Sequence, residues 1–85
     1  MINKVIYLFN GHNIDEKSFY SRFITNILNY NKHLNPSQMH FKIIYYLERL
    51  DKNNIVTIPI TFVNLNGIVT ETLYENQYER IITKK

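Results

Sequence analysis

Histidine is the residue type in this chain best suited to bind a metal or move a proton, and three histidines are present. His12, His33 and His40 show neither H-x-H nor H-x-x-x-H spacing, so a single element cannot supply two metal ligands. A histidine at the end of a loop or on the flank of a helix is usually a solvated polar residue. We therefore predict no metal site.

Carboxylates offer acid–base chemistry at two places in the sequence. Asp15 and Glu16 fall at the expected start of a helix, where negative charge offsets the helix dipole. Glu71, Glu75 and Glu79 recur at every fourth residue and can form a local acidic patch. Solvated strand or turn positions explain these three glutamates more simply.

The sequence also lacks the patterns that nucleophilic and nucleotide chemistry require. Ser18, Ser21 and Ser37 lie on or at the start of expected helices, and no G-x-S-x-G motif is present. Gly11 and Gly67 are the only glycines, too few for a phosphate-binding loop. The absence of cysteine excludes disulfides, thiolate metal sites and cysteine nucleophiles. We predict no catalytic residue and no cofactor, which makes an enzyme the less favoured class.

One predicted helix carries the most informative surface. Its outer side holds two aromatic and three cationic side chains: Phe41, Lys42, Tyr45, Arg49 and Lys52. Aromatic and arginine side chains dominate interface hot spots, so this set predicts a site for a protein partner or a second copy of the chain. Alternatively, the cations follow phosphates while a base stacks on an aromatic ring. A third interpretation is that the helix is sandwiched, or that Phe41 and Tyr45 cover other core groups.

That helix is expected from Pro36 to about Lys52. Asn35 is the predicted N-cap, and Gln38 completes a capping box. The inner stripe of the helix is Met39, Ile43, Tyr46, Leu47 and Leu50.

An earlier helix is expected from about Asp15 to Tyr30, capped either by Asn13 in a capping box with Glu16 or by Asp15 itself. Its apolar stripe is centred on Tyr20, Phe23, Ile24 and Ile27, and the opposite face, which includes Asn26, is expected to be solvated.

Strands are expected at both ends of the chain. Ile2–Phe9 is apolar on both faces, and Asn10-Gly11 ends it. Ile55–Asn64 alternates, and its proline predicts an edge or a bulge. Asn66-Gly67 predicts a hairpin to a strand over Ile68–Tyr74. One face of such a sheet is expected to be wet and is a second candidate docking surface, with the residues Thr57, Pro59, Thr61, Val63, Thr70, Thr72 and Tyr74.

The final segment, Thr72–Lys84, fits either a helix or a strand. The strand is favoured because a second hairpin would pair Val69 with Ile82, Glu71 with Arg80 and Leu73 with Tyr78. The resulting prediction is a single α+β domain over residues 1–85 in β-α-α-β-β-β order. Two amphipathic helices pack on a three- or four-stranded, mainly antiparallel sheet.

Composition limits the environment of the protein. The 85 residues carry a net charge of +3 and no alanine or tryptophan, while isoleucine, asparagine, tyrosine and lysine are abundant. This bias follows AT-rich codons and favours a low-GC genome, including those of phages and mobile elements. No apolar stretch approaches the roughly 18 residues of a membrane helix, and no signal peptide is evident. We expect a soluble cytoplasmic protein, in the host cytoplasm if phage-encoded.

Together these observations favour a small non-enzymatic binding protein that inhibits or modulates a host macromolecular machine. Its partner is expected to be a host protein or nucleoprotein complex, with a homodimer also open and nucleic acid less favoured. Anti-CRISPR proteins and other inhibitors of bacterial defence belong to this class.

Two alternatives rest on element order. The predicted β-α-α-β-β-β order, the length and the basic charge resemble the RelE-like toxin fold. This resemblance implies an mRNA-cleaving activity that uses sheet residues, here Tyr78 and Arg80. An Asn35-capped helix followed by a hairpin is similar to a winged helix, which implies a nucleic-acid-binding regulator; its wing, Asn64–Gly67, carries no cation.

Overall fold

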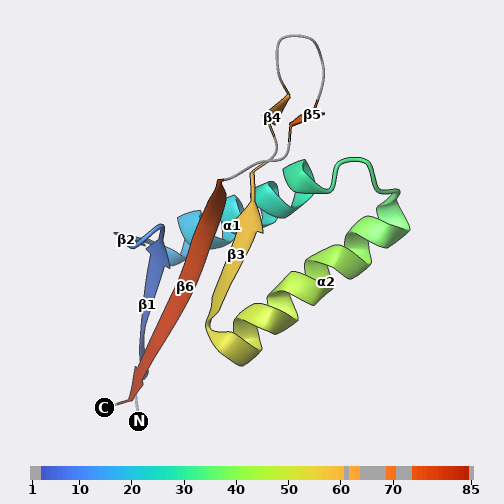
Figure 1. Cartoon of the computed structure of the whole chain (residues 1–85). Coiled ribbons are helices and arrows are strands. Elements are labelled where there is room, and N and C mark those ends of the chain that lie inside the picture. Colours follow the sequence, from blue (N-terminus) through green and yellow to red (C-terminus); the bar gives the residue numbers. More distant parts are fainter. Residues whose placement is uncertain (1–2, 61, 64–68, 71–73, 85) are drawn as a thin grey trace.

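The computed structural model describes residues 3–60, 62–63, 69–70 and 74–84 of the chain. Two helices lie on one side of a four-stranded antiparallel sheet with the strand order β2-β1-β6-β3 (Figure 1). This arrangement confirms the predicted α+β class. The elements are β1 (Asn3–Phe9), β2 (His12–Ile14), α1 (Glu16–Tyr30), α2 (Pro36–Asn53), β3 (Ile55–Pro59), β4 (Phe62–Val63), β5 (Val69–Thr70) and β6 (Glu75–Lys84).

A tight turn after β1 adds a strand that the sequence pattern did not predict. Asn10 and Gly11 both have positive φ, 50° and 82°, and they reverse the chain so that β2 pairs antiparallel with β1. Asparagine and glycine are the residues that tolerate this backbone conformation. Strand β2 has three residues, too short for an alternation of apolar and polar residues to identify it.

Local capping signals set the helix boundaries. Asp15 is the N-cap of α1, since its Oδ2 accepts a hydrogen bond from the backbone N–H of Ser18 at 3.0 Å. This selects Asp15 over Asn13 between the two predicted caps. The predicted capping box of α2 is confirmed by reciprocal bonds between Asn35 and Gln38 of 2.8 and 3.2 Å. Asn54, with φ of 60°, ends α2.

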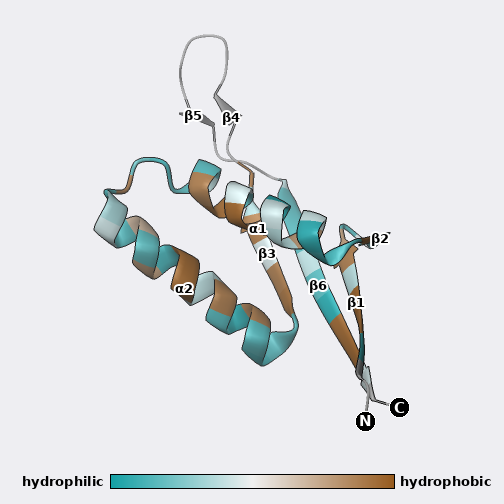
Figure 2. Cartoon of the chain, turned by 180° about the vertical axis from the view of Figure 1, so that it is seen from behind, coloured by the Kyte–Doolittle hydropathy of each residue, from teal (hydrophilic) through white to brown (hydrophobic). Residues whose placement is uncertain are grey.

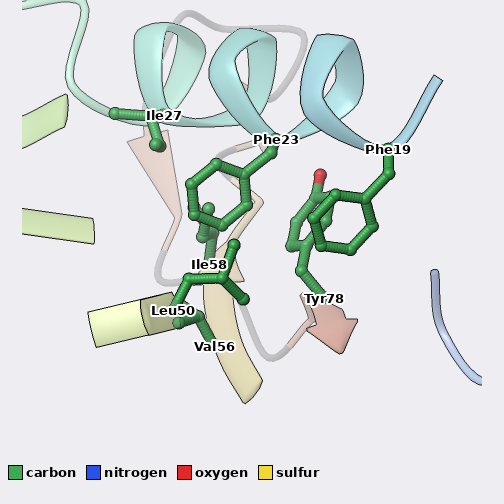
Figure 3. Packing of buried hydrophobic residues seen from close by; sticks show 7 residues of the cluster. All are labelled: Phe19, Phe23, Ile27, Leu50, Val56, Ile58 and Tyr78. Carbon is green, nitrogen blue, oxygen red and sulfur yellow. The ribbon is translucent and has the colours of Figure 1, made fainter. Parts of the chain in front are cut away.

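Seven side chains form the buried core between the helices and the sheet (Figure 3): Phe19, Phe23, Ile27, Leu50, Val56, Ile58 and Tyr78. The Tyr78 ring meets Phe23 edge-on at 5.0 Å between centroids and Phe19 edge-on at 5.7 Å. Edge-to-face contact is favoured because the positive rim of one ring meets the negative face of the other. The aromatic cluster therefore joins α1 to the middle of the sheet.

The buried face of α1 differs from its predicted stripe. Phe19 lies at the centre of this face, whereas Tyr20 and Ile24 are half-buried at its margin. Asn26, predicted to be solvated, is only 9% exposed. Its side chain is hydrogen-bonded to β3 and β6, so burial leaves its polar atoms with partners.

Strand β6 confirms the strand prediction for the final segment, but its predicted pairing was wrong. It lies between β1 and β3, and Tyr78 is opposite Phe9 on one side and Val56 on the other. The central position is favoured over the predicted local hairpin because there β6 forms hydrogen bonds along both of its edges and Tyr78 is buried. Strand β3 is an edge strand, as its Pro59 predicted.

The chain leaves the main sheet after Pro59. Strands β4 and β5 pair antiparallel in a separate two-stranded sheet, with Phe62 opposite Thr70 and Val63 opposite Val69. This pairing agrees with the predicted hairpin, although Asn66 and Gly67 lie outside the described residues. The single strand predicted over residues 55–64 is therefore divided between two sheets.

Candidate partner-binding site on helix α2

Helix α2 is anchored by one side and exposed on the other. Leu50 is buried, and Ile43, Tyr46 and Leu47 pack against the core, as the inner stripe predicted. On the outer side Phe41 is 68% exposed and Tyr45 is 47% exposed. These two rings therefore do not cover other core groups, which excludes that interpretation of the sequence.

Two cations approach the Tyr45 ring. The Lys42 Nζ lies 5.3 Å from the ring centroid, and the Arg49 Cζ lies 5.5 Å from it. Both distances fall within the roughly 6 Å at which a cation is attracted to an aromatic face. The positions three residues before and four residues after Tyr45 place both cations beside it on a helix. Their charge is concentrated around one exposed aromatic group.

A shallow hollow lies next to this group. It has a volume of about 440 Å³ and is lined by Leu34, Gln38, Phe41, Lys42 and Tyr45. Leu34 comes from the connection before α2, where its backbone N–H donates to the carbonyl of Asn31 at 2.9 Å. The hollow is open and has apolar walls, with a lysine at its rim. It suits an apolar side chain from another protein.

The structure thus brings together four of the five predicted residues on one exposed surface. We call Phe41, Lys42, Tyr45 and Arg49 the α2 face. The fifth residue, Lys52, is exposed in the last turn of the helix, where its charge also offsets the helix dipole. Glu48 is exposed between these cations. Because it offsets only one of the charges of Lys42, Arg49 and Lys52, the surface stays positive overall.

The other candidate chemical groups remain apart. His12 lies on β2, His33 follows α1 and His40 lies on α2. Within the described ranges, no group of three or more histidine or acidic side chains is placed to hold a metal ion. Glu75 and Glu79 lie on β6, whereas Glu71 lies outside the described residues.

A polar cleft between α1 and the ends of β3 and β6 was missed by the sequence analysis. Its volume is about 440 Å³, and its lining includes Arg22, Asn29 and Lys32. The guanidinium of Arg22 lies 5.1 Å from the centroid of the Phe9 ring. No local signal identifies this cleft, because its residues come from four elements far apart in the sequence.

Two residues of the cleft lining, Asn26 and Asn76, belong to a chain of amide side chains. Asn10 donates to Asn76 at 3.1 Å, and Asn76 donates to the Oδ1 of Asn26 at 2.8 Å. Asn26 donates in turn to the carbonyl of Pro59 at 3.2 Å. These groups are paired with one another, so the network holds α1 onto the sheet without requiring a ligand.

Tyr7 borders another shallow depression, beside β1 and the start of α1. Burial raises the pKa of Tyr7 to about 12, and a hydrogen bond with Tyr20 adds to the rise. A tyrosine with such a pKa keeps its proton at neutral pH and is not a general base there. This arrangement therefore offers packing and hydrogen bonding rather than acid–base chemistry.

Neither helix of the described chain has the length and apolar character needed to cross a membrane. Comparison with protein-family models, with curated proteins and with solved structures finds no match. The exposed aromatic and cationic side chains of the α2 face are the feature of the described chain most typical of a binding site.

Proposed function

We propose that this protein is a non-enzymatic binding protein that docks an acidic protein surface through the α2 face. The observation that carries the proposal is the exposed Tyr45 ring with Lys42 and Arg49 beside it and Phe41 one turn away. Aromatic and arginine anchors next to a hollow are typical of interface hot spots. Partner carboxylates would meet the two cations while an apolar side chain enters the hollow.

This kind of interaction suits an inhibitor or modulator. A binding surface on a capped, packed helix is rigid, so little conformational entropy is lost on association. If the chain is encoded by a phage or mobile element, such a surface would let it block a larger host assembly. An anti-CRISPR protein would act in this way.

The placement of the sheet residues favours binding over RNA cleavage. Tyr78 is 1% exposed and lies beneath α1, so its hydroxyl cannot reach a substrate. Arg80 lies on the same side of the sheet, where it forms an ion pair with Asp51 at 3.2 Å. The two residues that the RelE-like resemblance would use are therefore engaged in the fold.

The test is affinity purification of the tagged chain, with protein and nucleic acid quantified in the same eluate. The Phe41→Ala/Tyr45→Ala variant is compared with the wild type and with a Leu28→Ala control. Leu28 is 40% exposed on the other helix, so this control removes exposed apolar surface elsewhere. We expect a protein partner that is lost in the double variant and kept in the control.

A charge-reversal variant tests whether the two cations contribute to binding of the partner. Lys42→Glu/Arg49→Glu should weaken the same complex, and added salt should weaken the wild-type complex, because exposed charges are screened. A partner held equally by the wild type and both α2 variants would overturn the proposal. An eluate with nucleic acid as the retained species would favour the regulator or toxin alternatives instead.

A further inference from the structure

The main sheet has one face that none of the described helices covers. Side chains alternate along a strand, and Tyr7, Tyr78 and Val56 point into the core. The residues directly before and after each of them in the strand therefore face away from the helices. Helix α1 crosses the other side of the sheet, and α2 lies beside the β3 edge, with its Leu50 in the core on that same side (Figures 1 and 2). Thr57 and Pro59, from the predicted docking surface, are at the end of this open face.

Branched apolar side chains cluster at the centre of the open face. Ile6 is opposite Ile81 in the register of β1 and β6, and Leu8 is opposite Glu79. Ile55 of β3 is opposite Glu79 from the other side. Ile81 is 37% exposed and Ile55 is 41% exposed. A wet sheet face normally carries polar residues, so four aliphatic residues around one glutamate indicate a contact surface.

Two charges lie at equal distances on either side of this centre, and Glu75 lies farther out, at the end of the face beside Pro59. Lys4 lies two residues from Ile6 along β1, and Glu79 lies two residues from Ile81 along β6, toward the opposite end. The pair Ile6–Ile81 is therefore midway between one positive and one negative residue. A two-fold axis through this pair, across the strands, exchanges the two ends of the face.

That rotation makes the surface complementary to itself. Ile6 and Ile81 of one copy would contact the same residues of the other. Glu79 would come opposite the second copy's Thr83, which is paired with Lys4 on the neighbouring strand. Neighbouring strands are about 4.8 Å apart, a distance that a lysine side chain spans easily. Each copy thus supplies both the apolar centre and the two charges that the other copy needs.

We propose that two copies of this chain associate through the open sheet face. The two sheets would stack about 10 Å apart with the Ile6–Ile81 pairs at the centre, as in sheet-on-sheet packing. The contact is isologous and closes as a dimer. It leaves the α2 face free, because α2 lies on the opposite side of the sheet.

The area of the face limits the strength of the dimer. The patch extends over five residues along β1 and over the three strands β1, β6 and β3. From the rise per residue and the spacing of strands, it measures roughly 17 Å by 14 Å. Stable complexes bury about 800 Å² on each partner, which is more than such a patch supplies. The dimer is therefore expected to be weak, reversible and dependent on protein concentration.

The test is sedimentation velocity over a range of protein concentrations, with circular dichroism to confirm that each variant is folded. The wild type should shift from monomer to dimer as concentration rises. Ile81→Lys should reduce the association constant by roughly tenfold or more, because it places a charge at the apolar centre. Because Ile81 is exposed, the variant should keep its fold.

A charge swap tests the proposed orientation. Lys4→Glu and Glu79→Lys should each weaken the dimer roughly threefold or more, and the two together should restore it. The Phe41→Ala/Tyr45→Ala variant is the matched control and should dimerise like the wild type. A wild type that stays monomeric throughout, a dimer that survives Ile81→Lys, or a double swap without recovery would each overturn the proposal. Loss of the dimer in the α2 variant would place self-association on helix α2 instead.

Discussion

The Tyr78 hydroxyl lies 3.0 Å from the Oδ1 of Asn26 and donates to it, with the carbonyl of Arg22 as a second acceptor at 3.1 Å. This contact joins the central strand to the middle of α1, toward which the Tyr78 side chain points in Figure 3. Because Asn26 also bonds to β3 and to Asn76, one side chain connects three elements.

The first prediction concerns Asn26 itself. Asn26→Ala should lower the free energy of unfolding by about 2–3 kcal/mol, because buried partners lose their hydrogen bonds. Asn29→Ala, at an exposed position one turn along the same helix, should change it by less than about 0.5 kcal/mol. Urea denaturation measures both. Equal effects at the two positions would show that the amide network does not stabilise the fold.

The second prediction concerns alkaline pH. Burial raises the pKa of Tyr78 to about 12 from 10.0. Above pH 10 the unfolded chain therefore releases this proton before the folded chain does, so stability falls as pH rises toward 12. The loss is about 1.4 kcal/mol per pKa unit, or roughly 2–3 kcal/mol in total.

Tyr78→Phe should not lose the part of the free energy of unfolding that depends on this proton as pH rises. At neutral pH the variant should be less stable than the wild type, because the hydrogen bonds of the hydroxyl are gone. Denaturation curves of both proteins between pH 7 and pH 12 measure the difference. Tyr7 contributes to the same pH window and remains in both proteins. A parallel pH dependence of the two curves would contradict the assignment.

The third prediction separates two roles of Asn10. Its backbone has positive φ, and its side chain accepts from the N–H of Gln77 at 2.7 Å and donates to Asn76 at 3.1 Å. Asn10→Gly should keep the turn and cost about 1–2 kcal/mol for the lost bonds. Asn10→Ala should cost about 1 kcal/mol more, since alanine disfavours positive φ. Equal midpoints in thermal unfolding would mean that the turn has no such backbone requirement.

The fourth prediction contrasts two phenylalanines. Phe19 is fully buried, so Phe19→Ala should cost about 3–5 kcal/mol, a large fraction of the stability of a chain this short. Phe41→Ala should change stability by less than about 0.5 kcal/mol, because the ring is exposed. Chemical denaturation gives both values. A strongly destabilised Phe41→Ala variant would show that the ring supports the fold, which the binding proposal does not allow.

The features of α2 that could be predicted are those set by residues close together in the sequence. The Asn35–Gln38 box depends only on neighbours in sequence, and the predicted start of α2 followed from it. Phe41 and Tyr45 were placed correctly on the outer side of α2 by helical periodicity. Their exposure, however, depended on whether a further layer covered the helix, and periodicity contains no information about that.

The remaining errors share a physical origin. Strand β6 offered matched pairs to a neighbouring segment, but it pairs with β1 and β3, where Tyr78 is buried in the core. Asn26 is polar and was assigned to solvent, whereas its partners, Pro59 and Asn76, are at least 33 residues away. Contacts between residues this distant leave no periodic signal. The polar cleft was missed for the same reason, and of the open sheet face only the end at Thr57 and Pro59 belonged to the predicted docking surface.

The order of strands also has a consequence for synthesis of the protein. The strand at the centre of the sheet, β6, is the last of the described elements to leave the ribosome. Until it arrives, β1 and β3 have no common neighbour, and the aromatic residues beneath α1 lack Tyr78 as their cover. The main sheet can therefore form only after β6 has been synthesised, and until then the nascent chain carries exposed strand edges that invite aggregation. Slow translation of the segment before β6 would lengthen that exposure, and chaperones that bind extended apolar segments would shorten it.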